Sequence, residues 1–555
     1  MQTLRRFFSA VISASLILLN LAAAGQAQDV MLKSRDGAIE LSGTLLGFNG
    51  EFYRVETVYG ELTVDGLGVT CDGPGCPSLT DYIAQVRLSG ARELGLVLIP
   101  ALLEAFAAQN HLLAVLEPID DSRFTYVLKD QRSDKIQAEF HFQLSTAEEG
   151  FADLIADNAE ISMSTREIRA AEKHRLEEGQ PHDLPYRREH VLALDALVPV
   201  TIPDHPVRQI SLKNLALVFG GKITNWRDLG GPNAPIALYL RSHASGTSQS
   251  VTDRILQPAD QDITDAVTHI ADGKDLDLQV SRDPLALALM THSYIRFSHP
   301  MQISGDCGVS LGADPRMIKT QDYPITTPIF LYMAMHRLPK IAREFLAYTS
   351  TDSAQAVIER AGFINQNLEE IPLNQQGDRL VQAVSVAGTG SVEKAMDLDA
   401  SKPSTQNTGT TLKDLQNMLN FLAPLRRVTM SFRFLSGSSQ LDAQSRANIH
   451  RLAMVLESRA YDGRQLAFVG FSDGLGPASR NLEIAQKRAE TIRDAVLKIA
   501  EAVNLDRINI TTTAFGEAMP MACDDTEWGR DVNRRVEIWA VSYTHLRAHE
   551  TPSNL

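Results

Sequence analysis

Residues 236–256, IALYLRSHASGTSQSVTDRIL, join an apolar run to a turn of small polar residues and then to a helical pattern. This order predicts a strand, a loop and a helix, with Ser245, Gly246 and Thr247 in the first turn of the helix. Backbone N–H groups there lack intrahelical partners, and the helix dipole favours negative charge. Arg241 adds a forked cation. The stretch therefore predicts either a site for a tetrahedral oxyanion or an ordinary capped helix after a turn.

Strand-like and helix-like patterns alternate from about residue 81 to residue 368. Residues 84–109 predict a strand, a small-residue turn at 89–91 and a helix with apolar positions at helical spacing. The alternation is typical of an α/β fold with a parallel sheet, in which ligands bind at the carboxyl ends of strands. The turns at 89–91 and 163–166 would lie at the same edge as the turn at 241–247. Three anion-capable turns on one scaffold favour the binding site over the capped helix.

Composition sets limits on partners and cofactors. The 555-residue chain is 44% hydrophobic, so it can bury more than one core, and its length suggests about three or four domains. Its net charge of −15 argues against non-specific binding to nucleic acid or to an anionic membrane surface. No His and no second Cys pair stands at the spacing of metal ligands, so we expect neither a metal nor another cofactor.

The first 27 residues predict the compartment. Arg5 and Arg6 precede an apolar run over residues 7–21, and small residues follow over 22–27. This is typical of a cleaved secretory signal peptide, residues 1–27, and the apolar run is short for a membrane anchor. We therefore expect a soluble protein exported to the periplasm, associated with the cell wall or the outer membrane.

Export makes the four cysteines candidates for disulfides. Cys71 and Cys76 flank a tight loop of turn residues and predict a local bridge. Cys307 and Cys523 fall in different predicted domains. The sequence leaves open whether these two are free thiols or a pair.

The rest of the chain divides by composition. Residues 28–78 alternate polar and apolar positions between glycine turns and predict a small β-rich module. Residues 79–369 hold the α/β pattern. Residues 370–420 are rich in Gln, Asn, Ser, Thr and Gly and predict a flexible linker. Residues 421–541 predict a compact α+β domain, and we expect residues 542–555 to be a non-native tail without function.

The α/β part resembles the periplasmic phosphate-binding proteins of ABC transporters. The resemblance covers about residues 80–368, and its most specific block is LVFGGKITNW at residues 217–226. It also includes Gly230-Gly231, residues 241–247, the Asp322-Tyr-Pro-Ile block and Leu331-Tyr332. The resemblance implies two α/β lobes joined by a hinge and closing on phosphate or a similar oxyanion, with an ABC permease as a further candidate partner.

Carried over position by position, the resemblance implies a set of oxyanion-binding residues. They are Ser89, Ala91, Ser164, Arg166, Arg241, His243, Ser245, Gly246 and Thr247.

His243 departs from the family pattern. Phosphate binders carry an Asp at this position, and the resemblance implies that this carboxylate accepts the proton of hydrogen phosphate and repels sulfate. A charged histidine only donates hydrogen bonds, so it cannot replace that carboxylate. Either His243 changes the ligand preference or it simply points to solvent.

The C-terminal part, about residues 425–541, resembles the OmpA-like peptidoglycan-binding domain. The matching blocks are residues 470–473 and 515–517, Asn481, Arg488-Ala489, and residues 529–530 and 533–536. The resemblance implies that Asp473 and Arg488 hold the diaminopimelate of the peptide stem, with Asn481 and Arg534 in the same site. A zwitterionic amino-acid end requires a carboxylate for its ammonium and a guanidinium for its carboxylate. Of Arg534 and Arg535, one is expected to pack structurally.

Three functions compete. The favoured one is a non-enzymatic binding protein that captures phosphate or a similar oxyanion and is tethered to peptidoglycan; such a tether would let it dock less freely on a permease. The second is a structural wall protein whose α/β domain has lost its ligand. The third is a phosphatase using His243 and Ser245, but no carboxylate is visibly placed to orient the histidine.

Overall fold

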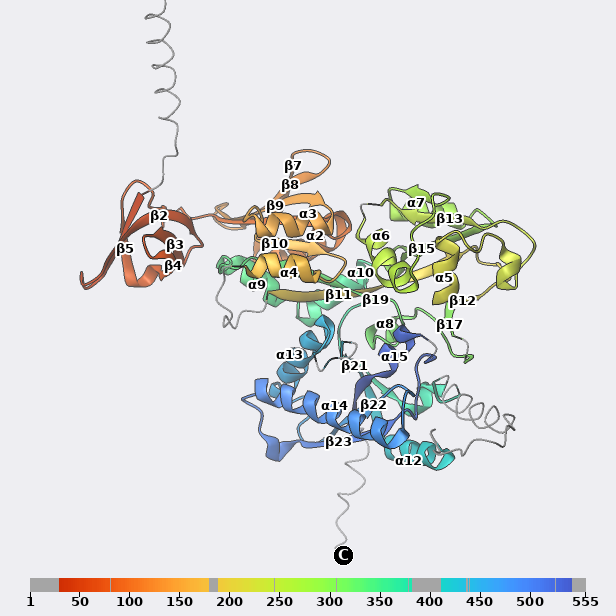
Figure 1. Cartoon of the computed structure of the whole chain (residues 1–555). Coiled ribbons are helices and arrows are strands. Elements are labelled where there is room, and N and C mark those ends of the chain that lie inside the picture. Colours follow the sequence, from red (N-terminus) through yellow and green to blue (C-terminus); the bar gives the residue numbers. More distant parts are fainter. Residues whose placement is uncertain are drawn as a thin grey trace, which may run out of the picture.

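The computed structural model describes residues 29–79, 81–178, 188–243, 245–305, 307–377, 379–381, 411–435, 438, 440–524 and 526–541. The expected signal peptide and C-terminal tail lie outside these residues. Three parts are visible in Figure 1: an N-terminal β module, a two-lobed domain beside it, and a C-terminal domain beneath the strands that join the lobes. Within the described residues, no helix is both long and apolar enough to cross a membrane.

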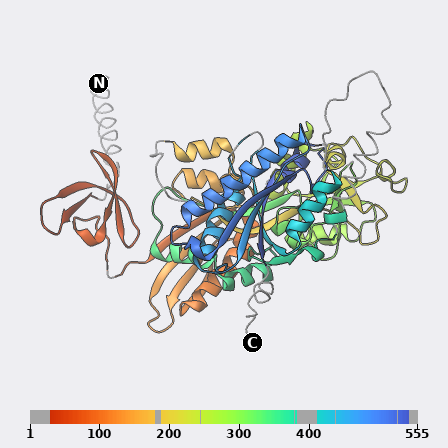
Figure 2. The same cartoon turned by 90° about the horizontal axis from the view of Figure 1, so that it is seen from below.

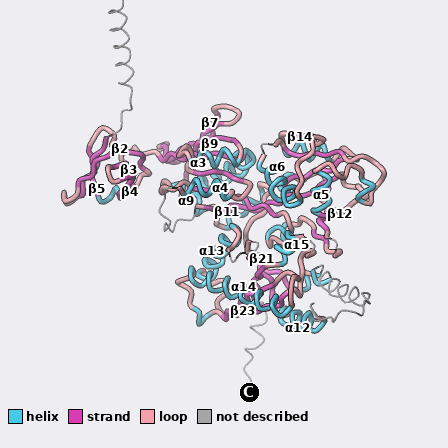
Figure 3. The backbone as a smooth tube through the Cα atoms, viewed as in Figure 1, coloured by secondary structure: helices cyan, strands magenta, loops and turns pink. Residues whose placement is uncertain are grey.

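The N-terminal β module is an antiparallel sheet in the order β4-β3-β2-β1-β5, and Figure 3 shows it as mostly strand. Val30, Leu32, Tyr53 and Val55 form its small buried core. Cys71 and Cys76 form a disulfide at its end. Its strands are β1 (Asp29–Ser34), β2 (Glu40–Phe48), β3 (Phe52–Thr57), β4 (Gly60–Asp65) and β5 (Val69–Asp72).

One eleven-stranded sheet runs through both lobes of the two-lobed domain. Two long, almost wholly buried strands, β11 (Glu189–Thr201) and β19 (Thr326–Met333), pair antiparallel at its centre and pass from one lobe to the other. Their mainly apolar residues suit strands that are covered on both faces. This confirms the predicted two-lobed α/β fold, with these two strands as the connection that was expected to be the hinge. The sheet is mixed and not parallel as predicted, because the strands that join the lobes and those at the edge of lobe 1 pair antiparallel.

Each lobe adds strands and helices to one side of the hinge. Lobe 1 contains β6 (Ala84–Ala91), β7 (Leu112–Pro118), β8 (Arg123–Asp130), β9 (Ile136–Ser145), β10 (Ile161–Ser164), α2 (Ile99–Gln109), α3 (Ala147–Ile155), α4 (Ala170–Glu177), α9 (Lys340–Tyr348) and α10 (Asp352–Arg360). Lobe 2 contains β13 (Ala237–Arg241), β14 (Thr268–Ile270), β15 (Ala286–Thr291), α5 (Leu212–Phe219), α6 (Gly246–Val251), α7 (Gly273–Val280) and a small sheet of β12 (Gln209–Ser211), β17 (Gln302–Ser304) and β18 (Ser310–Leu311).

The C-terminal domain is the predicted α+β unit, with a sheet in the order β20-β21-β24-β22-β23. Gly470 of β22 is needed for close packing of α14, because a Cβ there would lie 2.0 Å from the Ala485 carbonyl oxygen. The elements are β20 (Glu370–Pro372), β21 (Leu425–Arg433), β22 (Gln465–Phe471), β23 (Asn509–Gly516), β24 (Arg535–Val541), α12 (Leu412–Leu422), α13 (Ala443–Glu457), α14 (Ala478–Ile499) and α15 (Glu527–Asn533).

The segment expected to be a flexible linker, 370–420, is ordered at both described ends. β20 pairs with β21, and α12 packs by its buried face on the C-terminal domain. Polar composition therefore did not mark a free linker there, since these residues complete the domain. The middle of the segment, 382–410, lies outside the described residues.

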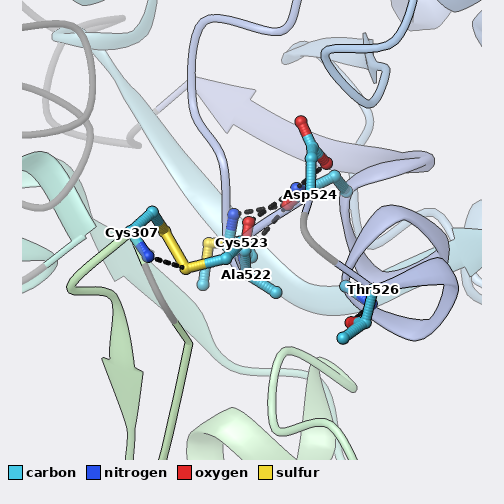
Figure 4. Close-up of a disulfide and its surroundings, with 8 residues drawn as sticks. Cys307, Ala522, Cys523, Asp524 and Thr526 are labelled. Atoms are coloured by element: carbon cyan, nitrogen blue, oxygen red, sulfur yellow. Dashed lines mark hydrogen bonds between the residues drawn. A yellow bond between two sulfur atoms is a disulfide. The ribbon is translucent and has the colours of Figure 1, made fainter. Parts of the chain in front are cut away.

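The C-terminal domain lies across the two-lobed domain (Figure 2). A disulfide joins Cys307, in the loop between β17 and β18, to Cys523 of the C-terminal domain (Figure 4). Trp528 donates its indole N–H to the carbonyl of Pro324 at 3.1 Å. The two cysteines that the sequence left open are thus a covalent bond between domains.

A buried ion cluster lies at the same interface. Arg427 of β21 binds Asp322 of the two-lobed domain at 2.5 Å, and Glu537 of β24 is bound by Arg379 at 2.5 Å and by Arg535 at 2.7 Å. All of these side chains are buried. The cluster consists of Asp322, Arg379, Arg427, Arg433, Arg535 and Glu537.

Candidate functional site

An ion pair crosses the cleft between the lobes. Arg241 ends β13 in lobe 2, and its Nη2 donates to Oε1 of Glu93, which follows β6 in lobe 1, at 3.0 Å. The guanidinium also lies over the ring of Tyr294. Both charged side chains are about nine-tenths buried, so their attraction is screened less than at a surface. The Nε of Arg241 is buried and has no partner.

The predicted oxyanion loop lies beside this pair. Ser245 caps α6, and its Oγ accepts from the N–H of Ser248 at 3.2 Å. Gly246 faces Thr165 of lobe 1 so closely that a Cβ at Gly246 would lie 2.0 Å from the Thr165 Oγ1. That Oγ1 is buried and has no hydrogen-bond partner. The lobes are therefore in contact at the loop, and only glycine allows the contact.

Two further contacts hold the lobes together. The Nε of Arg166 donates to Oε1 of Gln249 at 3.1 Å, and Arg169 pairs with Asp253 at 2.9 Å. Arg166 is also fixed by Glu172 at 2.6 Å. Ser164 shapes this turn, because its Oγ accepts from the Arg166 N–H and donates to the Arg166 carbonyl. These residues thus join lobes rather than expose a free cation.

Little room remains inside the cleft. The cavity there has a volume of about 10 Å³, which holds about one water molecule. Its walls include Glu93, Thr247 and Asp195 of the hinge strand β11. Burial raises the pKa of Asp195 to about 6. The lobes are closed on each other in this structure, and the cavity is too small for a tetrahedral oxyanion.

The structure does not bring all the predicted residues to this cavity, which corrects the expectation of one converging set. Ser89 donates its Oγ to Asp153 at 2.5 Å and lines a separate groove on lobe 1. Ala91 is buried at the end of β6. His243 stacks on His269, with ring centroids 3.6 Å apart, and lines a groove outside the cleft.

Glu93, Thr165 and Tyr294 were missed by the sequence reasoning. Glu93 lies two residues beyond the predicted first loop, and Thr165 lies between the predicted Ser164 and Arg166. Their side chains reach the cleft because lobe 1 folds over lobe 2, a long-range arrangement that no local pattern encodes.

A second group of charged residues lies in the C-terminal domain. Asp473 follows β22 and accepts from Nη1 of Arg534 at 2.6 Å, and Arg534 also pairs with Asp531. Arg488 of α14 lies over the ring of Phe434, and no hydrogen bond or ion pair links it to another described residue. Burial lowers the pKa of Arg488, and the nearby charge of Arg534 lowers it further.

Asn481 and Arg535 have different surroundings from this group. The side-chain amide of Asn481 donates to the carboxylate of Glu517 at 3.2 Å. Arg535 is fully buried in the ion cluster, so it is the structural member of the Arg534-Arg535 pair.

Comparisons with known proteins identify both domains. Residues 121–353 match the PBP superfamily domain, and residues 433–534 match the OmpA family. The chain joins a PBP superfamily domain to an OmpA family domain. The two-lobed domain and the C-terminal domain are these two units.

Relatives match one domain at a time. The phosphate-binding protein PstS of Borreliella burgdorferi is 24% identical over 210 residues, which are 37% of this chain and 71% of that protein. Outer membrane porin F of Pseudomonas fluorescens is 30% identical over 116 residues, 21% of this chain and 34% of the porin. A solved putative phosphate ABC transporter substrate-binding protein from Clostridium perfringens, with bound phosphate, is 19% identical with a TM-score of 0.38, covering 51% of this chain and 99% of that one.

Proposed function

We propose that this chain is a non-enzymatic protein of the periplasm that captures phosphate or a similar tetrahedral oxyanion in its cleft and holds peptidoglycan with its C-terminal domain. The observation that carries the first half is Arg241, a cation enclosed between the lobes with an unpartnered Nε. Relatives of the two-lobed domain bear the name phosphate-binding protein, which supports the choice of ligand.

Binding requires a rearrangement at Arg241. While the lobes are closed, the Glu93 carboxylate accepts a hydrogen bond from the Arg241 guanidinium and so blocks it for a ligand. When the lobes part, an oxyanion takes the place of that carboxylate and gains the N–H groups of Gly246 and Thr247 at the start of α6. The two hinge strands allow this motion, as in other two-lobed binding domains.

The wall-binding half rests on Arg488 and Asp473. Arg488 is a guanidinium without a carboxylate partner among the described residues, and Asp473 lies in the same charged group. A diaminopimelate end offers a carboxylate to the first and an ammonium to the second. The ammonium would share Asp473 with Arg534.

Calorimetric titration of the exported chain with phosphate and then with sulfate tests the cleft. We expect saturable heat from phosphate that Arg241→Gln abolishes and that the exposed control Arg282→Gln preserves. Sedimentation with purified sacculi tests the wall site separately, through Asp473→Asn and Arg488→Gln. Equal retention of the wild type and both variants would refute the second half alone.

One observation favours a structural wall protein as the second candidate. Glu93 already neutralises Arg241, and the cleft cavity holds about 10 Å³. In this alternative the two-lobed domain is a rigid spacer. Absence of heat with both anions, together with retention on sacculi, would establish it.

A further inference from the structure

A second cavity lies where the C-terminal domain meets both lobes, and we call it the junction cavity. Its volume is about 300 Å³, within the range of small-molecule sites. Its walls come from lobe 1, lobe 2, the start of β19 and the first turn of α13: residues 165–167, Ser250, Asp253, Arg254, Gln321, residues 326–328, Phe330 and residues 442–444. The cavity therefore exists only while the C-terminal domain is docked.

Arg254 of lobe 2 is a cation in this cavity without an ion-pair partner among the described residues. The protein around it desolvates its guanidinium and lowers its pKa. Its side chain nevertheless keeps an exposed surface, and the residue lines the cavity. Among the described residues, it makes one hydrogen bond, from Nη1 to the Thr326 carbonyl. A guanidinium so placed is left with donors for a ligand.

Asp442 of the C-terminal domain is the complementary anion. Its Oδ1 accepts from the N–H of Ser445 at 2.7 Å as the N-cap of α13. Asp442 attracts Arg254 and also the buried Arg433, but neither cation approaches it within ion-pair distance. A ligand with one charge of each sign would bridge the gap.

The other charges on the cavity wall are already neutralised. Glu167 pairs with Arg446 at 3.4 Å. Asp253 is paired with Arg169, and Arg166 with Glu172. These pairs leave Arg254 and Asp442 as the two charges available to a ligand.

Three buried polar side chains on the wall also have an unpartnered atom. They are the Oε1 of Gln321, the Oγ1 of Thr327 and the Oε1 of Gln444. Each side chain is at least nine-tenths buried. Buried polar atoms without partners are uncommon. These three belong to side chains that line the junction cavity, and Thr327 also lines the cleft cavity.

We propose that the junction cavity binds a zwitterionic α-amino acid with an uncharged side chain, its carboxylate on Arg254 and its ammonium on Asp442. The site is composite, since lobe 2 supplies the cation and the C-terminal domain supplies the anion. It is a separate cavity from the oxyanion cleft, although Thr165, Ser250 and Thr327 line both. Its occupant stabilises the docked arrangement of the two domains, because it binds only that arrangement.

Ligand-observed NMR and calorimetry on the full exported chain test the proposal with alanine, used separately as its L and D forms. Propionate and ethylamine are the matched probes, since each lacks one of the two charges of alanine. We expect saturable binding of alanine and at least about 10-fold weaker binding of either probe. Propionate binding as tightly as alanine, or no saturable alanine binding, would overturn the proposal.

Variants locate the site. Arg254→Gln and Asp442→Asn should each weaken alanine binding at least about 10-fold, and Asn still caps α13. The exposed controls Arg282→Gln and Asp260→Asn should leave it unchanged. If a charge variant fails to fold, Thr327→Val and Gln444→Leu replace it, since both keep Arg254 and Asp442. These two variants should also weaken alanine binding.

The proposed wall site also accepts zwitterions, so it needs its own control. Alanine binding should survive Arg488→Gln. Binding lost in Arg488→Gln but kept in Arg254→Gln would assign the alanine to the wall site and refute the junction site. These titrations are made without phosphate, because both lobes line the junction cavity and phosphate binding would part them.

Discussion

Asp322 of the two-lobed domain accepts two hydrogen bonds from the guanidinium of Arg427 in the C-terminal domain, at 2.5 and 3.1 Å. Both side chains are almost completely buried. Burial alone would raise the pKa of Asp322, but the attraction of Arg427 and Arg379 outweighs it and holds the pKa well below its usual range. The two domains are therefore joined by a desolvated ion pair as well as by a disulfide.

Replacing Asp322 with Asn should destabilise the chain strongly. The buried cluster would keep four arginines with Glu537 as its one carboxylate, and breaking a buried pair from one side costs about 3–5 kcal/mol. Urea unfolding measures the loss. The exposed control Asp262→Asn should unfold like the wild type. A loss of unfolding free energy below about 1 kcal/mol for Asp322→Asn would mean that water reaches the ion cluster and screens it.

Removing the disulfide between domains should cost more than removing the local one. The pair Cys307–Cys523 closes 216 residues, whereas Cys71–Cys76 closes 5. In the chain-entropy account a longer loop gives more stabilisation, typically about 2–4 kcal/mol. Thermal unfolding of Cys307→Ser/Cys523→Ser against Cys71→Ser/Cys76→Ser measures the difference. Equal shifts would show that the packed interface restrains the domains without the bond.

Local patterns predicted most of the fold. The strand, loop and helix expected over 236–256 appear as β13 and α6, and Ser245 caps the helix as the sequence suggests. Such features depend on neighbours in the chain. The small N-terminal sheet and the α+β domain were predictable for the same reason.

Docking of the domains was not predictable. Asp322 and Arg427 are charged residues that a sequence places at the surface, yet each is buried by the other's domain. In the same way Glu93 becomes part of the cleft only because Arg241 lies opposite on another lobe. Contacts between residues more than 100 positions apart leave no periodicity to detect.

Asp195 should make stability depend on pH in mild acid. Burial raises its pKa to about 6, against about 3.9 in the unfolded chain. The folded state thus binds the proton more tightly, so stability falls as pH rises from about 4 to about 6 and is level above that. The difference in unfolding free energy between wild type and Asp195→Asn, measured against pH, should change by up to about 3 kcal/mol across this window. If this difference in unfolding free energy does not change with pH, the pKa of Asp195 is not raised in the folded state.

Glu93→Gln should increase the affinity of the cleft for sulfate. The substitution removes a negative charge 3.0 Å from the Arg241 guanidinium and with it the competitor for the anion. We expect a gain of at least about 10-fold in calorimetry, whereas Glu148→Gln, on the exposed first turn of α3, should change nothing. An unchanged affinity for sulfate would show that Glu93 does not compete with the ligand at Arg241.

His243→Ala should leave anion binding unchanged, although the sequence made His243 a candidate for ligand selectivity. Its ring stacks on His269 and lines a groove outside the cleft. Thr247, by contrast, lines the cleft cavity and is nearly buried. Thr247→Val should therefore weaken phosphate binding by about 10-fold, the effect of one hydrogen bond to a charged group. In His243→Ala, the ratio of the affinities for phosphate and for sulfate should match that of the wild type. A changed ratio in His243→Ala would mean that the loop turns over when the lobes open, bringing the imidazole to the ligand.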